Sequence, residues 1–163
     1  MARTIVLRQL TMTARTRSEL EQTLAKRDVP ADAARRVLDR MTEVGLIDDA
    51  AYANEWVRQR QQGKGLARRA LANELRRKGI DDDLAADALA SVDDEAERSA
   101  AFDLAKRKAR ASRGQPNEKR VRSLVGMLAR KGYGPGMAYG VVRDVIALEG
   151  IEGVELPVPG LTD

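Results

Sequence analysis

RALANELRRKGIDDDLAADALASV, from Arg69 to Val92, predicts a pair of short helices joined by a tight turn. Leucines four residues apart, Leu71 and Leu75, share one face of the first helix. Gly79 stands just after that helix, where a C-terminal cap favours positive φ. The aspartates that follow it offer side-chain oxygens to the free N–H groups at the start of the second helix.

The same pattern occurs at two other places in the chain, in SELEQTLAKRDVPADAARRVLDRM (Ser18–Met41) and RSLVGMLARKGYGPGMAYGVVRDV (Arg122–Val145). Corresponding positions hold Leu20, Leu71 and Leu124; Leu24, Leu75 and Leu128; Arg27, Lys78 and Lys131; Val29, Ile80 and Tyr133; and Leu38, Leu89 and Val142. Asp28 takes the glycine position in the first copy, while Pro30 and Pro135 suit the start of the second helix. Thr16 with Glu19 predicts a capping box.

A further helix precedes each pair, so that each repeat holds three helices. It runs from Thr4 to about Met12 in the first repeat, and begins at Asp48-Asp49 and at Asp93-Asp94 in the others. Units this small are marginal alone and gain stability by packing in series. We therefore predict an all-α, elongated tandem array of three-helix repeats, with about nine helices in all. The predicted ranges are 1–46, 47–92 and 93–149, followed by a disordered tail over 150–163.

Composition excludes most catalytic chemistry. The 163 residues include no Cys and no His, so thiol or imidazole catalysis and Cys- or His-ligated metal sites are absent. Gly63-Lys64-Gly65 lacks the frame of a phosphate-binding loop, and the paired aspartates are best interpreted as helix caps. We predict no catalytic residue, no metal and no cofactor, and therefore not an enzyme. Without a long apolar run or a signal peptide, the chain is expected to be cytoplasmic; we also expect a monomer.

Positive charge is concentrated in two segments, although the net charge is only +4. Positions 58 to 78 hold eight basic residues and one acidic residue, Glu74. Positions 106 to 131 hold ten basic residues and one acidic residue, Glu118. Such segregation indicates a polyanionic partner; the alternative is that two solvated helix faces happen to be basic. Tyr52 and Trp56, on one helix face, are either core residues or interface anchors. The candidate partner-binding residues are Tyr52, Trp56, Arg58, Arg60, Lys64, Arg68, Arg69, Arg76, Arg77, Lys78, Lys106, Arg107, Lys108, Arg110, Lys119, Arg120, Arg122, Arg130 and Lys131.

LIDDAAYANEWVRQRQQGKGLARRALANELRRKGI, from Leu46 to Ile80, resembles the RecX family of recombination regulators, and in particular its actinobacterial members. Shared features are the hydrophobic pair and two acids at its start, the aromatic residues Tyr52 and Trp56, the glycine-rich basic turn, and the final Arg-Lys-Gly. The sequence around Arg15-Thr16-Arg17 and the sequence from Leu128 to Tyr133 resemble the family too. The match covers roughly residues 5–148.

The resemblance implies that the chain binds the RecA recombinase, chiefly its filament on single-stranded DNA. It also implies inhibition of the ATPase, strand-exchange and co-protease activities of RecA, and hence modulation of homologous recombination, DNA repair and the SOS response. Tandem three-helix repeats are the fold of the family.

An alternative from the residues themselves is a general DNA-binding protein built from helix-turn-helix-like units with a basic second helix. Direct contact with DNA is compatible with both readings. An enzyme remains only a remote third reading.

Overall fold

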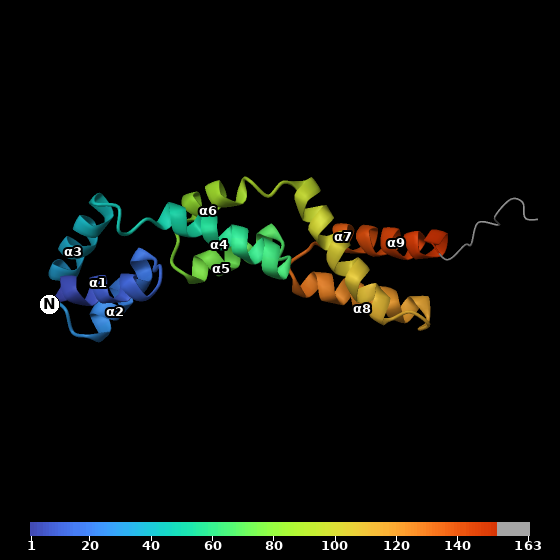
Figure 1. Ribbon diagram of the computed structural model, residues 1–163, viewed down its shortest axis with the longest axis horizontal. Helices are drawn as coiled ribbons and strands as arrows, with labels where there is room; N and C mark the ends of the chain where they lie inside the picture. Colours follow the sequence, from blue (N-terminus) through green and yellow to red (C-terminus); the bar gives the residue numbers. More distant parts are fainter. Residues whose placement is uncertain (153–163) are drawn as a thin grey trace, which may run out of the picture. The chain divides into compact units, whose positions relative to one another are not determined.

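The computed structural model describes residues 1–152, and every regular element in that range is an α-helix (Figure 1). In chain order the helices are α1 Ala2–Met12, α2 Arg17–Lys26, α3 Ala31–Glu43, α4 Asp49–Lys64, α5 Arg68–Arg77, α6 Asp82–Leu89, α7 Asp94–Ala111, α8 Asn117–Arg130 and α9 Pro135–Glu152. The predicted all-α class is confirmed. Two compact units divide the chain: Met1–Asp93 contains α1–α6, and the second unit begins at Asp94.

The helices follow the predicted pattern, with differences at the two ends of the chain. Helix α1 begins at Ala2, two residues before the predicted start at Thr4. Helix α9 continues to Glu152, so residues 150–152, predicted to belong to a disordered tail, are helical. The rest of that predicted tail, residues 153–163, lies outside the described residues. Within residues 1–152, no helix is both long enough and apolar enough to cross a membrane.

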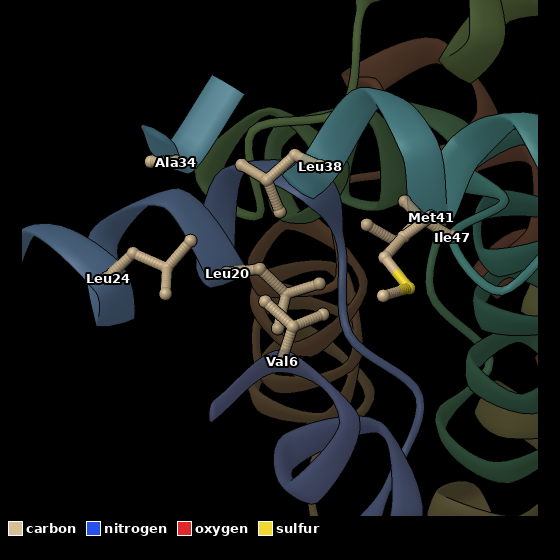
Figure 2. Close-up of a cluster of buried hydrophobic side chains, with 7 residues drawn as sticks. All are labelled: Val6, Leu20, Leu24, Ala34, Leu38, Met41 and Ile47. Atoms are coloured by element: carbon tan, nitrogen blue, oxygen red, sulfur yellow. The ribbon is translucent and has the colours of Figure 1, made fainter. Parts of the chain in front are cut away.

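The core of the first repeat is aliphatic and draws on all three of its helices. Val6 of α1 points toward Leu20 of α2, and Leu38 of α3 lies above them in Figure 2. The cluster consists of Val6, Leu20, Leu24, Ala34, Leu38, Met41 and Ile47. Each buried leucine contributes about 2 kcal/mol through removal of its apolar surface from water. The leucine spacing that predicted the helices therefore also marks the residues that hold them together.

Thr16 closes the N-terminus of α2 with the predicted capping box. Its hydroxyl accepts a hydrogen bond from the Glu19 backbone N–H at 3.1 Å, and the Glu19 carboxylate accepts one from the Thr16 N–H at 3.1 Å. The same hydroxyl donates to the backbone carbonyl of Lys78 at 2.7 Å. Thr16 is fully buried, so one side chain both starts α2 and joins it to the end of α5.

The three predicted tight turns contain residues with positive φ. The angle is 58° at Asp28, 76° at Gly79 and 96° at Gly132. Gly79 has a second constraint, because a Cβ atom placed on it would lie 2.2 Å from Cβ of Ser18. A real Cβ cannot approach so closely. Gly79 thus allows the α5–α6 turn to pack against the start of α2, which the turn signal alone does not reveal.

The predicted role of the paired aspartates as caps holds for only some of them. Asp48 accepts a hydrogen bond from the Ala51 N–H at 3.0 Å, as a cap of α4 does. Asp49 instead accepts from the Arg17 N–H at 3.0 Å, which links α4 to the start of α2. Asp81 makes no side-chain cap, and Asp82 forms an ion pair with Arg76 at 3.4 Å. Among residues 1–152, no group of acidic side chains could hold a metal ion.

The second unit packs small side chains between α7, α8 and α9. Ala101, Ala105 and Ala109 repeat every four residues along α7 and are fully buried. The leucines of α8 and the valines of α9 are also buried: Leu124, Leu128, Val141, Val142 and Val145. Alanine lets neighbouring helices approach closely, and Tyr133, between α8 and α9, adds a buried aromatic side chain to this core.

Candidate partner-binding surface

Tyr52 and Trp56 form the aromatic centre of the first unit. They lie one turn apart on α4, with ring centroids 6.0 Å apart and an interplanar angle of 15°. Both side chains are half-buried. Burial raises the pKa of the Tyr52 hydroxyl, and the nearby Glu19 carboxylate raises it further. The pair is therefore neither a fully buried core element nor a freely exposed anchor, and it combines the two readings that the sequence left open.

Two cations lie over the Trp56 ring. The guanidinium carbon of Arg60 is 4.5 Å from the ring centroid, and Nζ of Lys78 is 5.0 Å from it. Arg60 also pairs with Glu74 of α5 at 3.3 Å, and Lys78 pairs with Glu19 of α2 at 3.5 Å. Cation–π contacts of this kind are worth roughly 0.5–2 kcal/mol each. These two predicted site residues therefore have a structural role in joining α2, α4 and α5.

An open pocket lies beside the aromatic pair. Its volume is about 410 Å³, and it is lined by the end of α1, the 13–15 segment and the outer face of α4. Nε1 of Trp56 and Nε of Arg15 are buried, and neither has a hydrogen-bond partner among the described residues. An unsatisfied buried donor costs about 1–3 kcal/mol unless water or a ligand supplies an acceptor. Both atoms are covered, so a group in the pocket would reach them only after the two side chains shift.

Among the predicted site residues of the first unit, the exposed cations lie on α4 and α5. Lys64, Arg69 and Arg77 are exposed. Arg58 and Arg76 are exposed too, but each has an acidic neighbour, Glu55 and Asp82 respectively. Hydrogen bonds with Glu55 raise the pKa of Arg58, and those with Arg58 and Gln59 lower the pKa of Glu55. Arg68, at the start of α5, is half-buried.

Helix α5 separates its charge from its apolar side. Leu71 and Leu75 are fully buried, while Arg69 and Arg77 are exposed. Positions 69 and 77 are eight residues apart, or a little over two turns, so their side chains leave the same side of the helix. The result is a short cationic stripe opposite the leucine face.

Helix α8 repeats that arrangement in the second unit. Arg122 and Arg130, which correspond to Arg69 and Arg77 in the repeat alignment, are exposed, as is Lys119. Leu124 and Leu128 are buried on the other side. We call the exposed arginines Arg69, Arg77, Arg122 and Arg130 the repeated arginines. Further cations of this unit are exposed at Arg107, Lys108 and Arg110 and half-buried at Lys106 and Lys131.

Arg120 differs from the other predicted cations because it is only 6% exposed. Its Nη2 donates to Glu149 Oε2 at 2.7 Å and to the Ala109 carbonyl at 2.9 Å, and its Nε donates to the Ser112 hydroxyl at 3.1 Å. Arg113 approaches the same carboxylate at 3.7 Å. Arg120 thus joins α7, α8 and α9, and its guanidinium is not presented to solvent as a partner contact requires.

Sequence reasoning missed Arg15 and Gln59 as residues beside the aromatic pair. Gln59 could have been found, because it lies one turn beyond Glu55 on α4, close to Trp56. Arg15 carried no such signal. It lies in the segment between α1 and α2, and only the packing of these helices against α4 brings it to Trp56.

Two family models match the first unit. The first three-helix domain of RecX matches residues 2–41, which hold α1, α2 and most of α3. The second three-helix domain of RecX matches residues 48–89, from the α4 cap to the end of α6. Curated relatives extend the match over most of the chain: a regulatory protein RecX of Streptomyces coelicolor is 54% identical over 149 residues, covering 91% of this chain and 79% of its own length. The chain belongs to the RecX family.

Other RecX proteins are similar over an equal or greater length. The regulatory protein RecX of Thermobifida fusca is 48% identical over 158 residues, covering 97% of this chain and 85% of its own. A crystal structure of RecX from Lactobacillus salivarius has a TM-score of 0.81 and 23% identity, covering 90% of this chain and 95% of its own, which shows the shared fold. RecX is a family of regulatory proteins, so membership agrees with the prediction that this chain is not an enzyme.

Proposed function

We propose that this RecX-family protein binds the filament that the RecA recombinase forms on single-stranded DNA. Binding lowers the ATPase, strand-exchange and co-protease activities of RecA, and so modulates recombination and the SOS response in the cytoplasm. The observation that best supports a polymeric, anionic target is the recurrence of the repeated arginines in both units. A chain with equivalent cationic stripes on two units can contact a repeating polymer at more than one place.

Multiple contacts explain inhibition without chemistry. A monomer that holds two neighbouring sites of a filament gains affinity because the second contact is intramolecular. It also opposes the subunit movements that accompany ATP turnover. No catalytic group is needed for this effect. The Tyr52–Trp56 centre contributes by keeping α4 and α5 packed together, so that the stripe on α5 stays in place.

Charge reversal of the repeated arginines tests the proposal. The variants R69E/R77E and R122E/R130E each change one stripe, and all four residues are exposed. We expect each variant to need about tenfold more protein for half-maximal inhibition of the RecA ATPase on single-stranded DNA. The control R8E/R35E makes the same change in charge at exposed residues of α1 and α3. Unaltered inhibition by both stripe variants would contradict the proposal.

A general DNA-binding protein is the second candidate. It is favoured by the position of α5 and α8, each the second helix of a three-helix unit and each with exposed arginines. Binding to naked DNA and to RecA filaments, measured against salt concentration, separates the two functions. A DNA-binding protein shows a steep salt dependence, with a slope of about −0.7 per phosphate contact on single strands, and no preference for the filament. A filament regulator binds the filament more tightly at every salt concentration.

A further inference from the structure

An apolar groove lies between α1 and the end of α3 in the first repeat. Its volume is about 350 Å³. Its aliphatic lining comes from Leu7, Val37, Met41, Val44 and Leu46. The floor belongs to the core, since Met41 is a buried member of it and Val37 packs against it. The groove is distinct from the cationic stripes, because none of the repeated arginines lines it.

The rim of the groove exposes an unusual amount of apolar surface. Leu7 is 36% exposed, Val44 51% and Leu46 52%. These are three of the six large hydrophobic side chains that are exposed among residues 1–152. Scattered exposed hydrophobic residues are ordinary, but a contiguous group around a hollow indicates a binding surface.

Positive charge surrounds this groove. Arg3 of α1 and Arg36 and Arg40 of α3 line it, and no acidic residue does. Arg36 Nε donates to the Asp32 backbone carbonyl of its own helix at 3.4 Å. Arg40 pairs with Glu43 at 3.3 Å, with both side chains about two-thirds exposed or more, at 70% and 68%. Exposed pairs of this kind are weak, so the guanidinium groups can turn toward a ligand.

We propose that this groove binds an acidic amphipathic helix of a partner protein. Aliphatic side chains of the bound helix at positions i, i+3 or i+4, and i+7 occupy the groove, as in other helix-in-groove complexes. Carboxylates beside them meet Arg3, Arg36 and Arg40. The lining runs along α3 from Arg36 to Val44, about two turns of helix, which matches the span from i to i+7 of a bound helix. The occupant is a protein segment, not a nucleic acid, since no aromatic side chain lines the groove for base stacking.

This second contact goes beyond the proposed filament binding and uses other residues. It gives the first repeat, which lacks the basic runs of the other two, a role of its own. The surface is complementary to an acidic ligand, whereas a second copy of this groove is not acidic. Self-association through the groove is therefore an outcome that the experiment must be able to detect.

Fluorescence anisotropy with a defined peptide tests the inference. The probe is a labelled, capped 15-residue helical peptide with leucines at i, i+3, i+4 and i+7 and glutamates on both flanks. We expect it to bind the full chain. The variant R36E/R40E should bind it about tenfold more weakly, and V44D should weaken it by a similar factor. The matched control is R8E/R35E, which makes the same change in charge at exposed residues that do not line the groove.

Several results would overturn the inference. A scrambled peptide, or one with lysine in place of glutamate, could bind as tightly as the designed peptide. R36E/R40E could keep wild-type affinity for the peptide. The control R8E/R35E could lose as much affinity as R36E/R40E. Sedimentation experiments could show a dimer that V44D abolishes and that the peptide does not displace. That result would assign the groove to a second copy of the chain instead. The R69E/R77E variant should keep wild-type peptide affinity, so a failure of the filament proposal is distinguishable from a failure of this one.

Discussion

The hydroxyl of Thr16 donates a hydrogen bond to the backbone carbonyl of Lys78 at 2.7 Å, across the first two repeats. The side chain of Lys78 lies over Trp56 and pairs with Glu19, the partner of Thr16 in the capping box. The start of α2, the end of α5 and the aromatic centre on α4 are thus one connected structure. A defect at any of its members should be felt by the others.

Thr16→Val is expected to destabilise the first unit by about 2–3 kcal/mol. The change removes the cap of α2 and leaves the Lys78 carbonyl without its donor in a buried place. The free energy of unfolding from urea titration measures the loss. Thr11→Val is the control, because the Thr11 hydroxyl bonds the Leu7 carbonyl of its own helix and is exposed; we expect a change below about 0.5 kcal/mol there. Equal effects of the two substitutions would contradict the inter-repeat role of Thr16.

Gly79→Ala is expected to destabilise the protein more than Gly45→Ala. Both glycines have positive φ, 76° and 79°, so both substitutions introduce backbone strain of about 1 kcal/mol. Only Gly79 faces a neighbour, Ser18, whereas nothing lies within 4 Å of a Cβ on Gly45. The additional loss at Gly79, about 1–3 kcal/mol from overpacking, should appear as a lower midpoint of thermal unfolding. Adding Ser18→Gly to Gly79→Ala should recover part of it, and the absence of any recovery would argue against the close approach.

Arg120→Met and Arg122→Met should separate stability from binding. Arg120 is buried and holds Glu149, so its loss should cost about 2–4 kcal/mol of stability. Arg122 is exposed, so its substitution should leave the free energy of unfolding within about 0.5 kcal/mol of wild type while weakening filament binding. Urea titration and a RecA filament binding assay on both variants check this. The reverse pattern would overturn the assignment of roles to these two arginines.

Stability should decline above about pH 10 because of Tyr133. Burial raises the pKa of its hydroxyl to about 12, with a smaller contribution from Glu97. The unfolded chain therefore loses this proton near pH 10 and the folded chain near pH 12, so the contribution is complete below about pH 10 and is lost between the two values. The free energy of unfolding should fall between about pH 9 and about pH 11. This fall should be smaller in Tyr133→Phe than in wild type. Tyr139→Phe is the control, since Tyr139 is 53% exposed.

The helices and the capping box of α2 were predictable because their causes are local. Leu20 and Leu24 mark one face of α2, and the Thr16–Glu19 box joins residues three apart. The positive φ at Asp28 follows from its alignment with Gly79 and Gly132. The end of α9 was not predictable in this way, because the tail was expected to begin at position 150 and the helix continues to Glu152.

The candidate site was predictable only in part. The basic segments were visible in the sequence, but charge alone does not tell a buried Arg120 from an exposed Arg122. The cations over Trp56 were likewise counted as available, although Arg60 and Lys78 are tied to Glu74 and Glu19. Whether each of these cations is buried, paired or exposed depends on which helix packs against it. The periodicity within one helix does not predict that neighbour.

The amino-acid sequence alone established three repeats of short amphipathic helices, their turns and the absence of His and Cys chemistry. Those properties depend on interactions within about four residues and on composition. Tertiary packing decided that Gly79 meets Ser18, that Arg120 is buried against Glu149, and that Leu7 and Val44 remain exposed beside arginines. The physical reason is that burial and pairing are properties of helix faces in contact, and those contacts join residues far apart in the chain.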